Sequence, residues 1–437
     1  MHQYLNYNII IVKINVKKLL NKIQKGHMAT WVTITILYII KEKTEEKNMR
    51  VVLSKRIAQE IVRIYAYHIA SSKVNEFFSY GVNEGATIPR DLDNSRREAK
   101  IIKSKFPQFS EDEVIEYTMI EELLEYCLSG ENRSMVDMFL ERVGESIKVF
   151  YPDEFSENPY IKNIRIDTTW CDRFRLDYSH FDPFELFFYD TAELDDELAI
   201  TIPHIGCFAE KFYYPSILEK AGDTSYTWMS VTPNEIYTME KQIAHARGNV
   251  LTLGCGMGYF AYMVSLKEDV TSVTIVECEQ EVIDLFQKYI LPQFEYKDKI
   301  TKVKGDAVEY LRDMTDGEFD YCFADIWRGV NDLEPYFAVK EIGRNFKKTQ
   351  MEYWIEDSIA IYLSEFVWIE ILETFFHSND VLLPYTPQAR MSIMGYKAGN
   401  YVKRLLEHEE ISRVDHIRYY LKPENIISLI NKTNIVF

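Results

Sequence analysis

Apolar residues recur at three- and four-residue spacing through most of residues 49–145, and this spacing is typical of amphipathic helices. A first helix is predicted over residues 51–70. More helix is predicted after residue 110, where Ser110 is suited to act as an N-cap and Glu113 completes a capping box. The pattern therefore predicts a helical region at this end of the chain.

Residues 146–224 show a different pattern. Short runs of aromatic and β-branched residues alternate there with Pro, Asp and Asn, which is typical of short strands joined by turns. We expect a small antiparallel sheet. The helical region and this β region can pack together as one assembly against the part of the chain that follows.

From residue 225 to about 385, short buried-strand patterns alternate with helical ones, as they do in a doubly wound parallel sheet. The predicted strands are residues 249–253, 272–276, 300–303, 319–324 and 353–357. Helix is expected from about Ser358 onward, and residues 386–437 are predicted to form a helical C-terminal region. The fold class is α/β, with a Rossmann-like, mainly parallel core between a mixed N-terminal region and a helical C-terminus.

Residues 1–48 differ from the rest, since Asn, Ile, Lys and Tyr dominate and no acid precedes Glu42. The apolar run at residues 29–40 is too short to span a bilayer and lacks a small-residue cleavage site. We expect a non-native or disordered extension, with Met49 as the natural start and no association with a membrane.

The composition excludes several classes of protein. Hydrophobic residues make up 47% of the chain and charged residues 27%, so the chain should fold. The formal net charge is −18, and residues 49–437 carry 42 basic against 65 acidic residues, or −23. Such a field repels a polyanion, so no nucleic-acid partner is expected. Six cysteines without a CxxC pair or zinc-type spacing predict no metal site and a cytoplasmic location.

A glycine-rich loop follows the first core strand directly. It reads Gly254-Cys255-Gly256-Met257-Gly258 and leads into a helical stretch at residues 259–266. Glycines let a ligand approach the backbone, and the helix N-terminus offers unpaired N–H groups. A dinucleotide fingerprint would need a third glycine at position 259, where this chain has Tyr259. By itself the loop is equally compatible with a turn that only closes a strand–helix unit.

Acidic residues follow the next three predicted strands. They are Glu277, Asp306, which Ala307 follows, and Asp325. The carboxyl ends of parallel strands meet at one edge of a doubly wound sheet, so these acids are expected beside the glycine loop. Together they are a more specific signal than the loop.

With these motifs, residues 249–327 resemble the core of class I S-adenosylmethionine-dependent methyltransferases. The resemblance implies that Gly254, Cys255, Gly256 and Gly258 border the methionine part of the cofactor. It also implies that Glu277 holds the ribose, and that Asp306 with Ala307 contacts the adenine.

The same core, preceded by a small β region, partly resembles spermidine synthases, which use decarboxylated S-adenosylmethionine. That family has an acid in the glycine loop, where this chain has Met257. It has a second Asp three residues after the catalytic one, where this chain has Arg328. These departures favour methyl transfer over aminopropyl transfer.

We therefore predict an S-adenosylmethionine-dependent methyltransferase for a small-molecule acceptor, with Asp325 as the candidate catalytic base. A spermidine synthase-like aminopropyltransferase and a non-catalytic S-adenosylmethionine-binding protein remain alternatives, and a homodimer stays open. Residues 228–235 and 353–357 could border the acceptor pocket, although ordinary packing would also explain their aromatic residues. A carboxylate- or phosphate-bearing acceptor would suit Arg328.

Overall fold

The computed structural model describes residues 49–52, 54–85, 92–105, 107–108, 114, 137–138, 141–143, 146–171, 173–195, 199–222, 224–377 and 393–437. The predicted extension at residues 1–48 and the predicted cap at Ser110 and Glu113 lie outside the described residues.

Five parallel strands form the central sheet of the described structure, in the order β13-β12-β11-β14-β15. Their bounds are Gly248–Leu253 for β11, Val270–Glu277 for β12, Ile300–Lys304 for β13, Tyr321–Ala324 for β14 and Gln350–Tyr353 for β15. The first strand lies in the middle because successive crossovers run first to one side and then to the other. The predicted Rossmann-like, mainly parallel core is confirmed, and its ligand edge lies beyond the carboxyl ends of β11 and β14.

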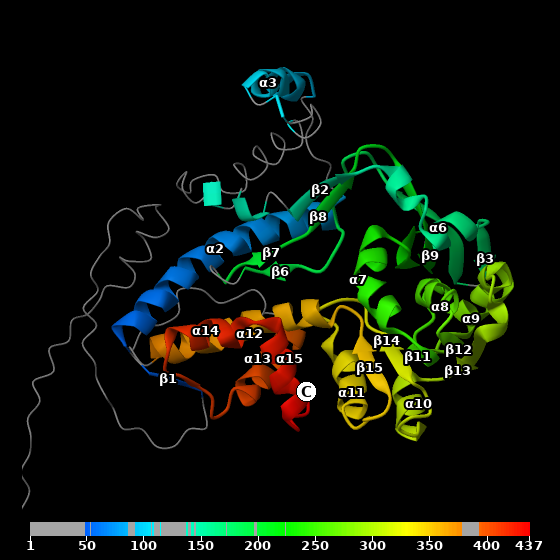
Figure 1. Cartoon of the computed structure of the whole chain (residues 1–437). Coiled ribbons are helices and arrows are strands. Elements are labelled where there is room, and N and C mark those ends of the chain that lie inside the picture. Colours follow the sequence, from blue (N-terminus) through cyan, green and yellow to red (C-terminus); the bar gives the residue numbers. More distant parts are fainter. Residues whose placement is uncertain are drawn as a thin grey trace, which may run out of the picture.

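Helices flank this sheet and alternate with its strands, as the sequence pattern predicts for such a core (Figure 1). They are α7 (Pro233–His245), α8 (Tyr259–Ser265), α9 (Gln280–Leu285, continued by a π-helical turn at Phe286–Ile290), α10 (Ala307–Asp313) and α11 (Leu333–Gly343). The predicted fifth strand ends at Tyr353 and not at 357. Ile355 has φ +47°, which ends the extended backbone, and Glu356 begins helix α12.

The β region is more complex than one antiparallel sheet. Strands β10, β9, β4 and β3 form a four-stranded antiparallel sheet, with bounds Thr224–Ser230, Phe212–Ala221, Phe174–Phe181 and Thr169–Cys171. A separate sheet joins β2 (Ile147–Phe150), β8 (Ile205–Phe208) and β5 (Phe187–Phe188), and its β2–β8 pair is parallel. Strands β6 (Glu193–Leu194) and β7 (Thr201–Ile202) pair with each other.

The antiparallel sheet also extends past the expected boundary at residue 224. Gly222, with φ +62°, lies in the tight turn that folds β10 back onto β9. Residues 224–230 therefore belong to the β region, although the sequence pattern assigned residues 225 onward to the core.

The long N-terminal helix α2 packs against the C-terminal helices (Figure 1). It spans Lys55–Asn83 and not 51–70, because Arg50–Val51 (β1) pairs with Glu410–Ile411 (β16) and Ser54 caps the helix. The other α-helices that the structure describes are α3 (Leu92–Lys105), α6 (Pro159–Asn163), α12 (Glu356–His377), α13 (Ile393–Leu405), α14 (Val414–Leu421) and α15 (Pro423–Lys432). Within the described residues, no helix is both long and apolar enough to cross a bilayer.

Candidate functional site

The glycine loop joins β11 to α8, and each of its three glycines has positive φ. A Cβ on Gly254 would lie 2.1 Å from the carbonyl oxygen of Asp325, and one on Gly258 would lie 2.4 Å from Cε2 of Phe286. These two glycines are therefore required by packing. Gly256 differs, because no heavy atom lies within 4 Å of the position its Cβ would take. Open space therefore adjoins the backbone at Gly256, which would allow a ligand to lie against it, and we call this open space the recess.

Glu277 connects the end of β12 to this loop. Its side chain is buried, with Oε2 accepting a hydrogen bond from the Cys255 amide at 3.0 Å and Oε1 accepting one from the Glu279 amide at 2.8 Å. A carboxylate offers roughly four acceptor positions. The predicted contact with ribose hydroxyls stays a prediction that this geometry allows.

Asp306 is the N-cap of α10. Its Oδ1 accepts hydrogen bonds from the amides of Val308 and Glu309, both at 2.9 Å. The side chain is exposed, whereas Ala307 behind it is buried. The cap alone explains an Asp at this position, so the adenine contact of Asp306 and Ala307 also stays a prediction.

Asp325 follows β14, and its amide donates a hydrogen bond to the Leu253 carbonyl at 2.9 Å. Burial raises the pKa of its carboxyl to about 7, and the negative charge of Glu277 adds to the shift. An acid with a pKa near neutrality can accept a proton under physiological conditions. The fold thus gives Asp325 the basicity that an ordinary surface aspartate lacks.

Glu235 is a second carboxylate close to Asp325. It comes from the first turn of α7, and its pKa is raised well above the usual range by burial and by the negative charge of Asp325. Sequence reasoning placed Glu235 only within the stretch 228–235. Nothing local to Glu235 distinguishes it, because its proximity to Asp325 depends on how α7 packs over the sheet.

Arg328 does not project as a free cation. Its guanidinium lies 5.1 Å from the ring centroid of Trp228 on β10, and its amide donates to Asp332. Trp228 in turn packs against Phe174 with ring centroids 5.5 Å apart. Arg328 therefore joins the antiparallel sheet to the ligand edge, and its suggested role toward an anionic acceptor stays untested.

Helix α6 of the N-terminal region braces the glycine loop from outside. The Tyr160 hydroxyl donates to the Met257 carbonyl at 2.5 Å, and the Asn158 amide donates to the Tyr259 hydroxyl at 3.1 Å. Tyr160 and Met257 are both buried. This contact fixes the loop that was assigned to the methionine part of the cofactor.

The described side chains support neither a metal site nor a reactive cysteine. No group of three or more His, Cys, Asp or Glu is arranged there to hold a metal ion. Cys255 is buried in the loop, and burial together with the charge of Glu277 raises the pKa of its thiol well above the usual range. The thiol is therefore protonated and acts as a small packing residue.

Comparison with known proteins adds a family match. Residues 235–394, less than half of the chain, match the model of the spermine/spermidine synthase domain. No curated protein matches significantly.

Solved structures with similar folds include a spermidine synthase from Thermotoga maritima, at 16% identity over 32% of this chain and 53% of that one, with a TM-score of 0.23. A spermidine synthase in complex with the transition-state analogue AdoDATO is 16% identical over 32% of this chain and 54% of that one, with a TM-score of 0.25. A putative O-methyltransferase from Klebsiella pneumoniae is 14% identical over 24% of this chain and 46% of that one, with a TM-score of 0.20. The chain spans about half the length of the spermidine synthases it matches. Similarities this low carry no argument about activity.

The strand order and the family match agree on the fold of the core. The core has the methyltransferase-like fold with a resemblance to spermidine synthases.

Proposed function

We propose that the protein transfers a methyl group from S-adenosylmethionine to a small-molecule acceptor. One observation carries the proposal: the recess at Gly256, the buried Glu277 and the basic Asp325 meet at one edge of the sheet. The recess supplies space for a ligand, Glu277 an acceptor for hydroxyl groups, and Asp325 a site for a proton.

The bound cofactor would supply an electrophilic methyl group on its sulfonium. The tasks of the protein are to orient the acceptor, to exclude water and to receive a proton. Glu277 and the glycine loop would fix the position of the cofactor. Asp325 would receive the proton that the acceptor releases.

Methyl transfer is favoured over aminopropyl transfer by the surroundings of the glycine loop. S-adenosylmethionine carries a carboxylate beside its ammonium, whereas an aminopropyl donor carries the ammonium alone and so calls for a nearby acid of the protein. The loop residue at that position is Met257, whose side chain is buried. This observation supports S-adenosylmethionine itself as the cofactor.

Aminopropyl transfer is a second candidate, and the pair of Glu235 and Asp325 favours it. Two neighbouring carboxylates with raised pKa values can hold the ammonium of an amine acceptor. Glu235 could then replace the acid that is missing at position 328.

A two-tube assay separates the candidates. One tube contains methyl-labelled S-adenosylmethionine and a cell extract, and the other contains decarboxylated S-adenosylmethionine and putrescine. Labelled product in the first tube alone supports the proposal, and spermidine in the second tube alone supports the rival. Asp325→Asn, which should lower the rate but retain cofactor binding, is the control for a protein-dependent reaction. Binding of S-adenosylhomocysteine without any product would indicate a non-catalytic binding protein.

We also propose that the acceptor is not a nucleic acid, because residues 49–437 carry a charge of −23. A gel shift with low-micromolar protein at physiological salt should show no complex with bulk DNA or RNA. The cysteines that the structure describes form no disulfide, which supports a proposed cytoplasmic location.

A further inference from the structure

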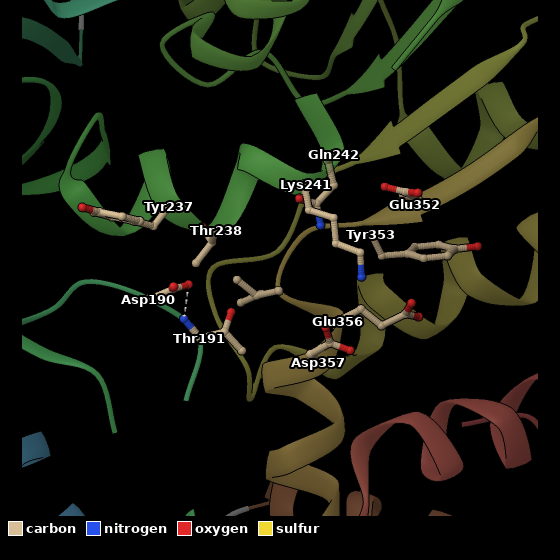
Figure 2. Close-up of a pocket in the computed structure, with 11 residues that line it drawn as sticks. Asp190, Thr191, Tyr237, Thr238, Lys241, Gln242, Glu352, Tyr353, Glu356 and Asp357 are labelled. Atoms are coloured by element: carbon tan, nitrogen blue, oxygen red, sulfur yellow. Dashed lines mark hydrogen bonds between the residues drawn. The ribbon is translucent and has the colours of Figure 1, made fainter. Parts of the chain in front are cut away.

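A cavity of about 380 Å³ lies between α7, the junction of β15 with α12, and a loop of the β region (Figure 2). Its lining residues are Asp190, Thr191, Tyr237, Thr238, Lys241, Gln242, Glu352, Tyr353, Ile355, Glu356 and Asp357. None of them belongs to the glycine loop or to the acids at its edge. The volume lies at the lower end of the range for small-molecule sites, about 300–1,000 Å³.

The charges in this cavity divide into two groups. Glu352 already accepts hydrogen bonds from Tyr321 and His245, and Glu356 accepts them from Tyr336 and Lys340. These two carboxylates are therefore satisfied by the protein.

Lys241, Asp190 and Asp357 differ from these two carboxylates, because they have no such partners among the described residues. Among the described residues, no carboxylate lies within 4.0 Å of Lys241 Nζ, and no cation lies within 4.0 Å of the Asp190 or Asp357 carboxylate. Within the described part of the chain, Asp190 accepts only from the amide of its neighbour Thr191, at 2.7 Å. The exposed Lys241 and Asp357 and the half-buried Asp190 thus bring to the same cavity one cation and two carboxylates that have no ion-pair partner in the described structure.

Two further features of the cavity wall are unusual. Oε1 of Gln242 is buried without a hydrogen-bond partner in the part of the chain that the structure describes. Most buried polar atoms in proteins have a hydrogen-bond partner, so this acceptor is unusual. Ile355 holds φ +47°, a costly conformation for a β-branched residue, and such strain clusters at ligand sites.

We propose that this cavity binds a small zwitterion of the α-amino acid type. The ligand carboxylate would pair with Lys241, and its ammonium would pair with Asp357 or Asp190. A simple amine would leave Lys241 unpaired and repelled, and a simple anion would face the two carboxylates. A molecule with both charges gives a partner to Lys241 and to one of the two carboxylates.

The cavity adjoins the transfer site in the fold. The Trp354 amide donates to the Ala324 carbonyl at 2.9 Å, which places residues 355–357 next to Asp325 along the same sheet edge. The proposal concerns binding alone, and it does not depend on the identity of the transferred group.

Calorimetry on the full chain tests it with defined probes. The twenty common L-amino acids are first screened by thermal shift, and the tightest binder is titrated beside its carboxamide and its N-acetyl derivative. The zwitterion should bind at least about tenfold more tightly than either singly charged analogue, since each loses one charged hydrogen bond. No binding by any amino acid, or equal affinity for an analogue, would overturn the proposal.

Variants then locate the site. Lys241→Met and Asp357→Asn should each weaken binding by about tenfold, whereas Lys432→Met, an exposed lysine on α15, should leave it unchanged. Unaltered affinity in both cavity variants would overturn the assignment to this cavity. S-adenosylhomocysteine titrated in parallel reports on the proposed transfer function separately, because its binding does not require Lys241 or Asp357.

Discussion

Gly256 combines a left-handed backbone, at φ +51°, with open space where a side chain would lie. A substitution there has two effects that can be separated. The backbone conformation costs any L-residue about 1–2 kcal/mol, and the new side chain occupies the recess. Only the second effect concerns the ligand.

We predict that Gly256→Val abolishes binding of S-adenosylhomocysteine in a calorimetric titration. Gly222→Val is the matched control, because Gly222 also has positive φ and open space but lies in the β9–β10 turn. Both variants should lose similar stability in thermal melts, and only Gly256→Val should lose binding. Retained affinity in Gly256→Val would remove the recess from the proposed cofactor site.

Asp325 should set the pH dependence of the reaction. Its pKa is raised to about 7, so the basic form increases as the pH rises through that value. We predict that the rate of label transfer rises with pH and levels off above the pKa. Asp325→Asn should lower the rate and remove this rise, whereas Asp313→Asn, an exposed residue on α10, should leave the profile intact. A wild-type rate that stays constant across neutral pH would contradict the assignment of the base.

The raised pKa of Asp325 also predicts that the stability of the protein changes with pH. An unfolded Asp titrates near about 3.9, below its value in the folded protein. The folded state therefore binds more protons between the two pKa values, and this group makes the protein less stable as the pH rises through that interval. Asp325→Asn should accordingly raise the melting temperature more at pH 8 than at pH 5.

At the scale of elements, the turn between β3 and β4 holds the loop that follows β12. Arg173 Nη2 lies 2.7 Å from Glu279 Oε2, and its Nε lies 3.4 Å from Glu281. Glu279 also donates its amide to Glu277. Arg173 is therefore a positioning residue for the acid beside the glycine loop.

We predict that Arg173→Ala weakens S-adenosylhomocysteine binding by about two- to fivefold, a modest effect because exposed ion pairs contribute roughly 0.2–1 kcal/mol. Arg173→Lys should recover part of the loss. Arg175→Ala is the control, since Arg175 pairs with Asp177 inside its own sheet at 2.6 Å. The difference between Arg173→Ala and wild type should shrink at high salt. Equal effects of the two alanine variants would point to general damage to the sheet.

At the scale of the molecule, one contiguous hydrophobic cluster joins three regions. It includes Ile61 of α2, Val250 of β11 and Ile426 of α15, all fully buried. Residues far apart in the sequence therefore share a core, and α2 and α14 are also joined by an ion pair between Glu60 and Arg418.

We predict that Ile61→Ala costs about 2–5 kcal/mol, the range for truncating a buried Ile. Because the core is shared, Ile61→Ala should lower the midpoint temperature of one thermal transition. S-adenosylhomocysteine should raise the midpoint temperature of the same transition. Calorimetric scans with and without ligand provide the measurement. A second transition, sensitive to Ile61→Ala but not to the ligand, would show that α2 belongs to an independent unit.

Some of this organisation was determined by the sequence alone. The core strands, the glycine loop and the acids Glu277, Asp306 and Asp325 were identified because strand periodicity and glycine turns are local signals. The parallel topology then places the carboxyl ends of these strands at one edge.

The remaining features depended on contacts between distant segments. The pairing of Glu235 with Asp325, the packing of Arg328 on Trp228 and the parallel β2–β8 pair join residues that no local pattern connects. The raised pKa of Asp325 is also a tertiary property, since burial and the charge of Glu277 cause it. Local chemistry selected the candidate residues, and long-range packing decided which of them meet and how strongly each holds a proton.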